Sequence, residues 1–260
     1  SAYFKCGWST TNYRISEMIS VCIATHNGEK YIKKQLESIL SQLDFSDEIV
    51  ISDDGSTDQT INLIQSLEDK RIKIFTYKQC FDYSKLYLSS YYYATANFHN
   101  ALRHAQGEII FLADQDDIWV ENRVSVFMKV LEKADFVTSN FSIIDEMDEL
   151  IEELYYDGNP YDNPNVVKIL KNLPFRGCCS AFKRDVLQVA LPFPKKLFLH
   201  DCWIGLNAYF NNFKIEFIET PLLLYRRHSN NVSDLNSPNS LFFKISYRLK
   251  LMWYVFVNRL

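Results

Sequence analysis

An apolar run that ends abruptly in three carboxylates is the segment whose residue types most clearly suggest chemistry. It reads Ile-Ile-Phe-Leu-Ala-Asp-Gln-Asp-Asp at residues 109–117, and its branched and aromatic residues predict a buried strand. Asp114, Asp116 and Asp117 would emerge at the carboxyl end of that strand, where open α/β sheets bind ligands. Clustered carboxylates repel one another, so a divalent cation bound between them is one interpretation. The alternative is a turn followed by a helix from residue 118, since Asp is a favourable N-cap.

Further polar residues follow other predicted strands or begin predicted helices. They lie at residues 25–27 and 53–58, at the pair His200 and Asp201, and at His228. Carboxylates and a Thr/Asn loop can hydrogen-bond the base and ribose of a nucleotide, and a metal ion held by carboxylates neutralises a diphosphate. A carboxylate or a histidine can deprotonate an attacking hydroxyl. Together these residue types suit a protein that handles a nucleotide-sugar.

The elements that must position these residues alternate between strands and helices, which predicts an α/β fold with a mostly parallel sheet of right-handed βαβ units. Apolar runs predict strands at residues 19–25, 48–52, 71–77, 109–113, 136–141 and 215–224. Helical spacing of apolar residues predicts helices at about 30–42, 59–67, 97–105, 120–133 and 200–209. The tyrosine-rich stretch 78–95 is expected to be a packing segment, the acidic run 145–153 a solvated face, and 155–175 a loop over the site.

The composition narrows the class of protein. The 260 residues suffice for one large domain or two small ones, and 47% hydrophobic and 23% charged residues are usual for a soluble globular protein. A net charge of −4 gives no support for nucleic-acid binding. The six cysteines form no Cys-x-x-Cys pair, which indicates reduced thiols and a cytoplasmic location. Residues 1–17 lack the pattern of a signal peptide and precede Met18, so they are interpreted as a leader of unclear origin.

The carboxyl-terminal stretch 241–260 is basic and aromatic and contains no acidic residue. Its longest apolar run, 251–257, is far too short to span a bilayer. A helix of this kind can lie in a membrane interface, and contact with the inner face of the plasma membrane is one expectation. The alternative is a terminal helix docked on the core or on a second subunit of a homo-oligomer.

Six motifs in this sequence resemble those of family 2 glycosyltransferases with the GT-A fold. They occur in the family's order across about residues 18–232, and the later ones are most similar to bacterial rhamnosyltransferase-like members. The motifs are Ser-Val-Cys-Ile-Ala-Thr-His-Asn (20–27), Ser-Asp-Asp-Gly-Ser-Thr-Asp (52–58), Ala-Asp-Gln-Asp-Asp-Ile-Trp (113–119), Gly-Cys-Cys-Ser-Ala-Phe (177–182), His-Asp-Cys-Trp (200–203) and Tyr-Arg-Arg-His (225–228).

The resemblance implies a donor site. Thr25 and Asp53 would contact the base, with Asn27 and Asp54 close by. Asp114 and Asp116 match the Asp-x-Asp motif, which implies a divalent cofactor, Mn²⁺ or Mg²⁺. Asp116 would bind the metal directly and Asp114 would contact the ribose or a metal-bound water, while Asp117 caps the following helix. His228 would be a further metal or diphosphate contact, and Arg226 and Arg227 would bind phosphate oxygens.

The resemblance also implies an acceptor side. Asp201 matches the base that deprotonates the acceptor hydroxyl, so that direct displacement inverts the anomeric centre. The sugar pocket would include Trp119, Gly177, Cys178, His200 and Trp203. Each role has a plainer alternative: Asp53 and Asp54 as turn formers, Asp201 as a helix cap, His228 as a surface histidine, and the two tryptophans as core residues.

The expected function is transfer of a sugar from a nucleoside-diphosphate donor, UDP- or dTDP-linked, to a hydroxyl of a bacterial surface glycan or lipid-linked oligosaccharide. Residues 18–120 would form the donor-binding half, 121–232 the acceptor-binding and catalytic half, and 233–260 the terminal helix. A nucleotidyltransferase is an alternative, although no Gly-rich phosphate loop follows the first strand. A non-catalytic nucleotide-sugar-binding protein is another.

Overall fold

The computed structural model describes residues 17–79, 81–162, 164–229, 231–232 and 240–257. The expected leader at 1–17, apart from its last residue, therefore lies outside the described residues, as do Cys6 and Cys80. The described part is a mixed α/β structure built on one nine-stranded sheet, and this confirms the predicted fold class.

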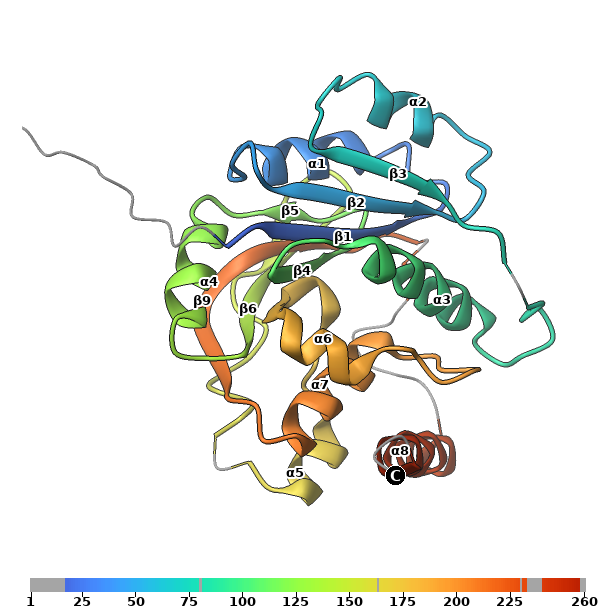
Figure 1. Ribbon diagram of the computed structural model, residues 1–260, viewed down its shortest axis with the longest axis vertical. Helices are drawn as coiled ribbons and strands as arrows, with labels where there is room; N and C mark the ends of the chain where they lie inside the picture. The colour runs from blue at the N-terminus through green and yellow to red at the C-terminus, as the bar shows by residue number, and fades with distance from the viewer. Residues whose placement is uncertain (1–16, 80, 163, 230, 233–239, 258–260) are drawn as a thin grey trace, which may run out of the picture.

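The amino-terminal half of the sheet is parallel and doubly wound (Figure 1). Its strands run in the spatial order β3-β2-β1-β4. They are β1 (Ile19–Thr25), β2 (Glu48–Asp53), β3 (Ile72–Thr76) and β4 (Ile109–Ala113). The helices between them are α1 (Ile32–Leu40), α2 (Thr60–Gln65) and α3 (Ser89–His104). Because the strand order reverses between β1 and β4, a crevice for a ligand is expected at their carboxyl ends.

Alternating residues of these strands are buried on opposite faces of the sheet. In β1, Val21 and Ile23 join the core under α1, whereas Cys22 joins the core under α3. In β4, Phe111 faces the first core and Leu112 the second. This two-sided burial explains why the strands are continuous apolar runs rather than alternating ones.

The carboxyl-terminal half adds antiparallel and long strands to the same sheet. β8 (Ser180–Lys183) is antiparallel to β4 and to β6 (Phe136–Ile144), and β9 (Ile215–Arg226) runs parallel to β6. The short strands β5 (Ile118–Trp119) and β7 (Leu150–Glu152) pair with β9 and β6. The helices here are α4 (Arg123–Leu131), α5 (Val166–Asn172), the 3₁₀ turn η1 (Gly177–Cys179), α6 (Arg184–Ala190), α7 (His200–Phe210) and α8 (Leu241–Val257).

Three local expectations differ from the structure. Ile118 and Trp119 form strand β5 and do not begin a helix, because they pair with Leu223 and Leu224 of β9. The tyrosine-rich stretch contributes the first two turns of α3, which begins at Ser89 rather than near residue 97. The segment 155–175 is not all loop, since it contains α5.

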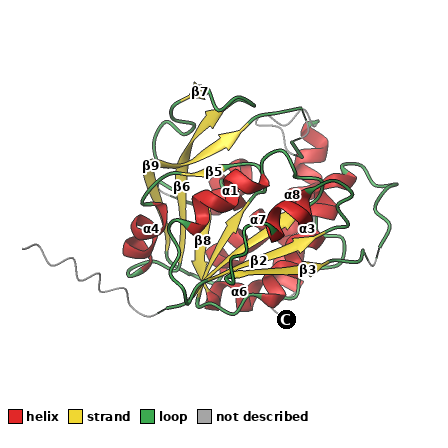
Figure 2. Ribbon diagram, turned by 90° about the horizontal axis from the view of Figure 1, so that it is seen from above, coloured by secondary structure: helices red, strands yellow, loops and turns green. Residues whose placement is uncertain are grey.

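Helix α8 lies outside the sheet layers, beside α7 (Figures 1 and 2). Leu251 and Val255 are its buried side chains. Phe243 and Tyr247 pack edge-on against Phe198 in the loop before α7. No described helix is both long and apolar enough to cross a bilayer.

Candidate active site

A cavity of about 940 Å³ opens at the carboxyl ends of β1, β2 and β4. Loops after all three strands reach it, together with η1, the start of α7 and the segment after β9. Its lining includes most of the residues that the sequence indicates, namely Thr25, Asn27, Asp54, Asp114, Asp116, Gly177, Cys178, His200, Asp201 and His228. Asp53, Arg226, Trp119 and Trp203 do not line it.

The wall beside β1 and β2 is built on Asp53, which is 4% exposed. One carboxylate oxygen of Asp53 accepts a hydrogen bond from Thr25 Oγ1 at 2.8 Å, and the other accepts one from Ser56 N at 2.9 Å. Asp53 therefore fixes the loop, and the neighbouring Asp54 reaches the cavity. Burial raises the pKa of Asp54, and Gln79 Nε2 donates to its carboxylate at 2.5 Å.

Gln115 ties the loop after β4 to the loop after β1. Its side-chain oxygen accepts a hydrogen bond from His26 N at 3.0 Å, and its Nε2 donates to His26 O at 3.2 Å. A Cβ at Gly28 would lie 2.5 Å from Gln115 Oε1, so a larger residue here would push the Gln115 side chain away from the His26 backbone. The loops that carry Thr25 and Asp114 are thus held as one unit.

The carboxylates of the Asp-Gln-Asp-Asp segment face different partners. Asp114 lines the cavity, and burial together with the negative charges of Asp116 and Asp201 raises its pKa to about 7. Asp116 Oδ2 lies 2.7 Å from Nε2 of His228, whose ring lies 5.0 Å from that of Tyr31. Three carboxylates from two segments far apart in sequence therefore share one electrostatic environment.

Asp117 does not cap a helix. The next helix begins only at Arg123, with Asn122 at the N-cap position, and β5 lies between. Asp117 is instead 1% exposed, and its Oδ1 accepts a hydrogen bond from Arg226 N at 3.0 Å. Burial raises the pKa of this carboxyl well above its ordinary value.

Arg226 is a structural residue and not a phosphate contact. It is only 1% exposed, and its guanidinium is buried behind the cavity. Nε donates to Asp116 O at 2.8 Å, and Nη1 donates to Asp145 O at 3.0 Å and to the Asp148 carboxylate. The guanidinium also lies 4.6 Å from the ring centre of Tyr31. Arg226 thus joins the acidic 145–149 loop to the backbone of Asp116.

Asp201 and His200 begin α7 at the opposite wall. Asp201 is in the first turn, and its Oδ1 accepts a hydrogen bond from Cys202 N at 2.7 Å. The His200 ring stacks on Phe98 with centroids 4.1 Å apart, and burial lowers the pKa of this imidazole. A Cβ at Gly177 would lie 3.2 Å from His200 Nε2, so glycine makes room for the ring.

The geometry agrees with comparisons to known proteins. The sequence model of the family named Glycosyl transferase family 2 matches residues 20–190, more than half of the chain. The chain belongs to this family. This match confirms the predicted family and enzyme class, and the solved structures that resemble the chain confirm the GT-A fold.

Three relatives and one solved structure illustrate the similarity. The glycosyltransferase is 28% identical to the UDP-Glc:alpha-D-GlcNAc-diphosphoundecaprenol beta-1,3-glucosyltransferase WfaP of Escherichia coli, over 94% of each chain. It is 28% identical to the dTDP-rhamnosyl transferase RfbG of Shigella flexneri, over 89% of this chain and 80% of that protein. S. aureus TarS 1-349 in complex with UDP-GlcNAc has a TM-score of 0.66 and 17% identity, over 90% of this chain. The glycosyltransferase spans 66% of that TarS chain and 66% of an uncharacterised Nostoc glycosyltransferase that is 26% identical to it.

The expected tryptophan walls of the sugar pocket are wrong for this glycosyltransferase. Trp119 is 3% exposed and packs against Phe111, with ring centroids 5.3 Å apart. Trp203 is 1% exposed, and its Nε1 donates to Ala190 O at 2.8 Å. Both rings belong to the core, and the N–H of Trp203 is satisfied there, whereas Trp119 Nε1 has no hydrogen-bond partner among the described residues.

The structure also brings to the cavity residues that the sequence analysis missed. Tyr31, Gln79, Gln115 and Glu146 line it. Glu146 pairs with Lys30 at 2.5 Å, so part of the acidic run is a wall of the site and not only a solvated face. For these missed residues, the sequence contained one indication, which is that Gln115 lies between the candidate metal ligands Asp114 and Asp116.

Replacing Arg226 by alanine is expected to destabilise the fold by about 1–3 kcal/mol, because it leaves the carbonyl oxygens of Asp116 and Asp145 without the donors of this buried guanidinium. The free energy of unfolding, measured by urea denaturation, checks this. Arg227→Ala is the control, since Arg227 is less buried and should cost clearly less. Equal losses in the two variants would contradict the structural role of Arg226.

The raised pKa of Asp114 predicts a pH dependence of stability in the absence of divalent ions. The folded protein retains a proton on Asp114 up to about pH 7, whereas the unfolded chain releases it near 3.8. Between these values the folded state binds more protons, so the contribution of Asp114 to stability falls as the pH rises. Asp114→Asn should show a smaller decline in Tm across this range than the unmodified protein. An unchanged decline would refute this assignment.

Proposed function

We propose that this glycosyltransferase transfers a sugar from a nucleoside-diphosphate donor to a hydroxyl of a bacterial surface glycan, with inversion at the anomeric carbon. The observation that carries the proposal is that Asp114, Asp116 and Asp201 meet at one cavity, close enough for Asp116 and Asp201 to shift the pKa of Asp114. Relatives named for O-antigen biosynthesis and for diphosphoundecaprenol-linked acceptors support the acceptor class.

The donor half of the site is residues 18–120. Thr25, Asn27 and Asp54 line the cavity beside the β1–β2 edge and supply hydrogen-bonding groups for the base. Asp53 acts by holding this wall, through Thr25 and Ser56. UDP- and dTDP-linked sugars are the donors to test first, because the names of the relatives specify UDP-Glc and dTDP-rhamnosyl, and TarS was solved with UDP-GlcNAc.

A divalent ion, Mn²⁺ or Mg²⁺, fits the residues at the carboxylate corner. Asp114 and Asp116 would supply oxygen ligands and His228 an imidazole. Burial first, and then the negative charges of Asp116 and Asp201, raise the pKa of Asp114, and a cation here would offset both effects. When bound, such an ion neutralises the diphosphate and the charge that develops as the sugar leaves. Arg226 would hold the metal ligand Asp116 in position, because its Nε donates a hydrogen bond to Asp116 O.

The acceptor half is residues 121–232, and Asp201 is its general base. Asp201 lies across the cavity from the β1–β2 wall, at the first turn of α7, where it can take the proton of the attacking hydroxyl. Gly177, Cys178 and His200 surround it and shape the sugar pocket. A direct displacement needs no enzyme nucleophile.

Helix α8 is proposed to rest on an anionic membrane at the cytoplasmic face. Its exposed side chains Phe242, Ile245, Leu249, Trp253 and Phe256 are 48–83% exposed and follow helical spacing on one side. Residues 241–257 hold three basic residues and no acidic one. Phe198, which lines the cavity, packs on the inner side of α8, so a membrane-bound α8 would bring the acceptor rim close to lipid.

Replacing Leu249 and Trp253 together by glutamate is expected to weaken binding to anionic phospholipid vesicles by about tenfold or more, since each apolar side chain would otherwise be buried. Co-sedimentation with phosphatidylglycerol vesicles measures this. Phe45→Glu is the matched control, because Phe45 is fully exposed but far from α8 in sequence. Concentration-dependent dimerisation without vesicle binding would instead assign this face to a second subunit.

Release of nucleoside diphosphate from a panel of UDP- and dTDP-sugars, with Mn²⁺ or Mg²⁺ and a lipid-linked glycan acceptor, tests the function directly. Dependence of release on the acceptor is expected for a glycosyltransferase of this kind. Release of pyrophosphate from a nucleoside triphosphate and a sugar phosphate would indicate a nucleotidyltransferase. Binding of donors with no turnover on any acceptor would indicate a non-catalytic nucleotide-sugar-binding protein.

A further inference from the structure

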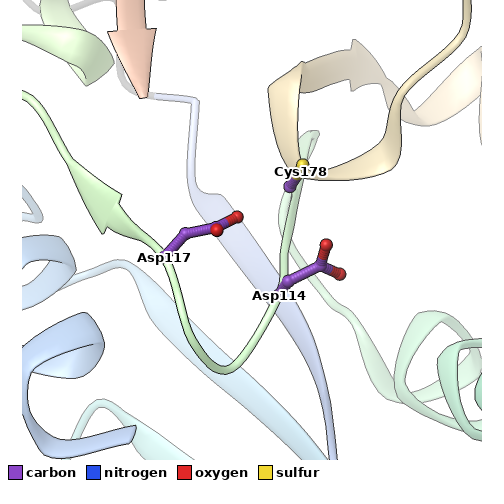
Figure 3. A group of neighbouring side chains, drawn as sticks. All are labelled: Asp114, Asp117 and Cys178. Carbon is purple, nitrogen blue, oxygen red and sulfur yellow. The ribbon is translucent and has the colours of Figure 1, made fainter. Parts of the chain in front are cut away.

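A second group of possible metal ligands lies on the inner side of Asp114. Asp114 and Asp117 come from the loop after β4, and Cys178 comes from η1 (Figure 3). One ligand atom from each of these three side chains lies within 4.8 Å of the other two. Asp116 and His228 are not part of this group, so it differs from the corner assigned above to the catalytic ion.

An unpartnered carboxylate oxygen points to a missing ligand here. Asp117 is 1% exposed, and its Oδ1 accepts the Arg226 N–H, but Oδ2 has no hydrogen-bond partner among the described residues. Figure 3 shows the Asp117 carboxylate directed toward the side where Asp114 and Cys178 lie. A buried carboxylate oxygen without a donor is costly, and a cation would offset that cost.

The backbone that carries the thiol is held in place. Arg123 Nη2 donates to Cys178 O at 2.8 Å, and the Arg123 side chain is fully buried against Phe127. Cys178 and Asp114 both line the cavity, whereas Asp117 lies behind them. An ion can therefore enter from the cavity, and its remaining coordination position would face the cavity.

We infer that Asp114, Asp117 and Cys178 form a site for a thiophilic divalent cation such as Zn²⁺. Two carboxylate oxygens and one sulfur are a ligand set that Zn²⁺ accepts, at about 2.0–2.2 Å for oxygen and about 2.3 Å for sulfur. Mg²⁺ and Mn²⁺ prefer oxygen ligands and gain little from a thiol. On binding, the Cys178 thiol and any protonated carboxyl of the group release their protons to solvent as the sulfur and oxygen atoms become ligands.

Because this site shares Asp114 with the proposed catalytic ion, Zn²⁺ bound there inhibits the glycosyltransferase. This inhibition rests on the proposed function, but the binding itself does not. Asp114 cannot serve both ions fully, and the charge of a zinc ion beside Asp116 disfavours a second cation at the neighbouring corner. The enzyme would thus be sensitive to free zinc even when Mn²⁺ is abundant.

Cobalt(II) titration of the metal-free full chain tests binding without any substrate. A thiolate ligand gives a sulfur-to-cobalt charge-transfer band, which carboxylates and imidazole do not give. The band is expected in the unmodified protein, is expected to disappear on adding Zn²⁺ but not Mg²⁺, and should be absent in Cys178→Ser. Cys179→Ser is the matched control, because Cys179 is the adjacent, equally buried thiol outside the group, and it should keep the band.

A second variant guards against a folding defect in the first. Asp117→Asn should retain the band but weaken Co²⁺ binding by at least about tenfold. A missing band in the unmodified protein, or a band that survives in Cys178→Ser, would overturn the site. In the transfer assay, we expect Cys178→Ser to need a Zn²⁺ concentration at least about tenfold higher than the unmodified protein does for half-inhibition, because it has lost a zinc ligand. Each protein's inhibition is measured against its own Mn²⁺-supported rate. If the band appears but no donor is turned over, the proposed function fails and the site stands.

Discussion

Substitution of Asp201 by asparagine is expected to lower the turnover number for sugar transfer by about 10²–10⁴-fold, the usual contribution of a general base. Asparagine keeps the size of the side chain and can still accept the hydrogen bond from Cys202 N, but it cannot take up a proton. The affinity for UDP should be unchanged, because the proposed base-binding wall lies at Thr25 and Asp54. Steady-state release of nucleoside diphosphate and calorimetric UDP binding measure the two quantities.

Asp185→Asn is the matched control for this experiment. Asp185 also lies in the first turn of a helix, α6, but it is exposed and outside the cavity. Its substitution should leave turnover unchanged. If Asp201→Asn keeps its activity while Asp116→Ala loses it, another group takes the acceptor proton and the metal assignment remains.

Replacing Asp116 by alanine is expected to lower kcat/KM by about 10²–10³-fold or more, comparable to removing a group that stabilises developing charge. Asp116 Oδ2 lies 2.7 Å from His228 Nε2, and its loss removes a negatively charged oxygen ligand from the corner. Mn²⁺ should therefore no longer strengthen UDP binding in this variant. Calorimetric UDP titrations with and without Mn²⁺ measure the effect.

Glu121→Ala serves as the control, because Glu121 is an exposed acid a few residues further along the chain. It should respond to Mn²⁺ as the unmodified protein does. A full Mn²⁺ response in Asp116→Ala would show that the ion binds elsewhere. Such a result would leave Asp201 untouched as the proposed base.

The parallel half of the fold could be predicted because its information is local. Each strand from β1 to β4 is a short apolar run flanked by polar turns, and two-sided burial makes that pattern strong. The position of β8 could not be predicted in this way, since it inserts between β4 and β6 through pairs such as Ile109 with Lys183. The start of α3 was also hidden, because tyrosines are weak helix formers whose packing decides the outcome.

The candidate site, like the fold, could be predicted from the sequence only in part. Residue types that bind nucleotides or metals were visible in the sequence, and the structure gathers most of them at one cavity. The direction of each side chain was not visible. Arg226 turns away from the cavity because Asp145 and Asp148, far away in sequence, accept its hydrogen bonds. Trp203 turns inward because the Ala190 carbonyl accepts its N–H.

The reciprocal hydrogen bonds between Gln115 and His26 have a consequence for engineering donor preference. They make the loop after β1 and the loop after β4 a single rigid part, with Gly28 as the contact point. Chimeras that exchange only one of these loops with a relative would mismatch the pair and misplace both walls. Grafts intended to change the donor should therefore carry the two loops together, and libraries should vary them jointly.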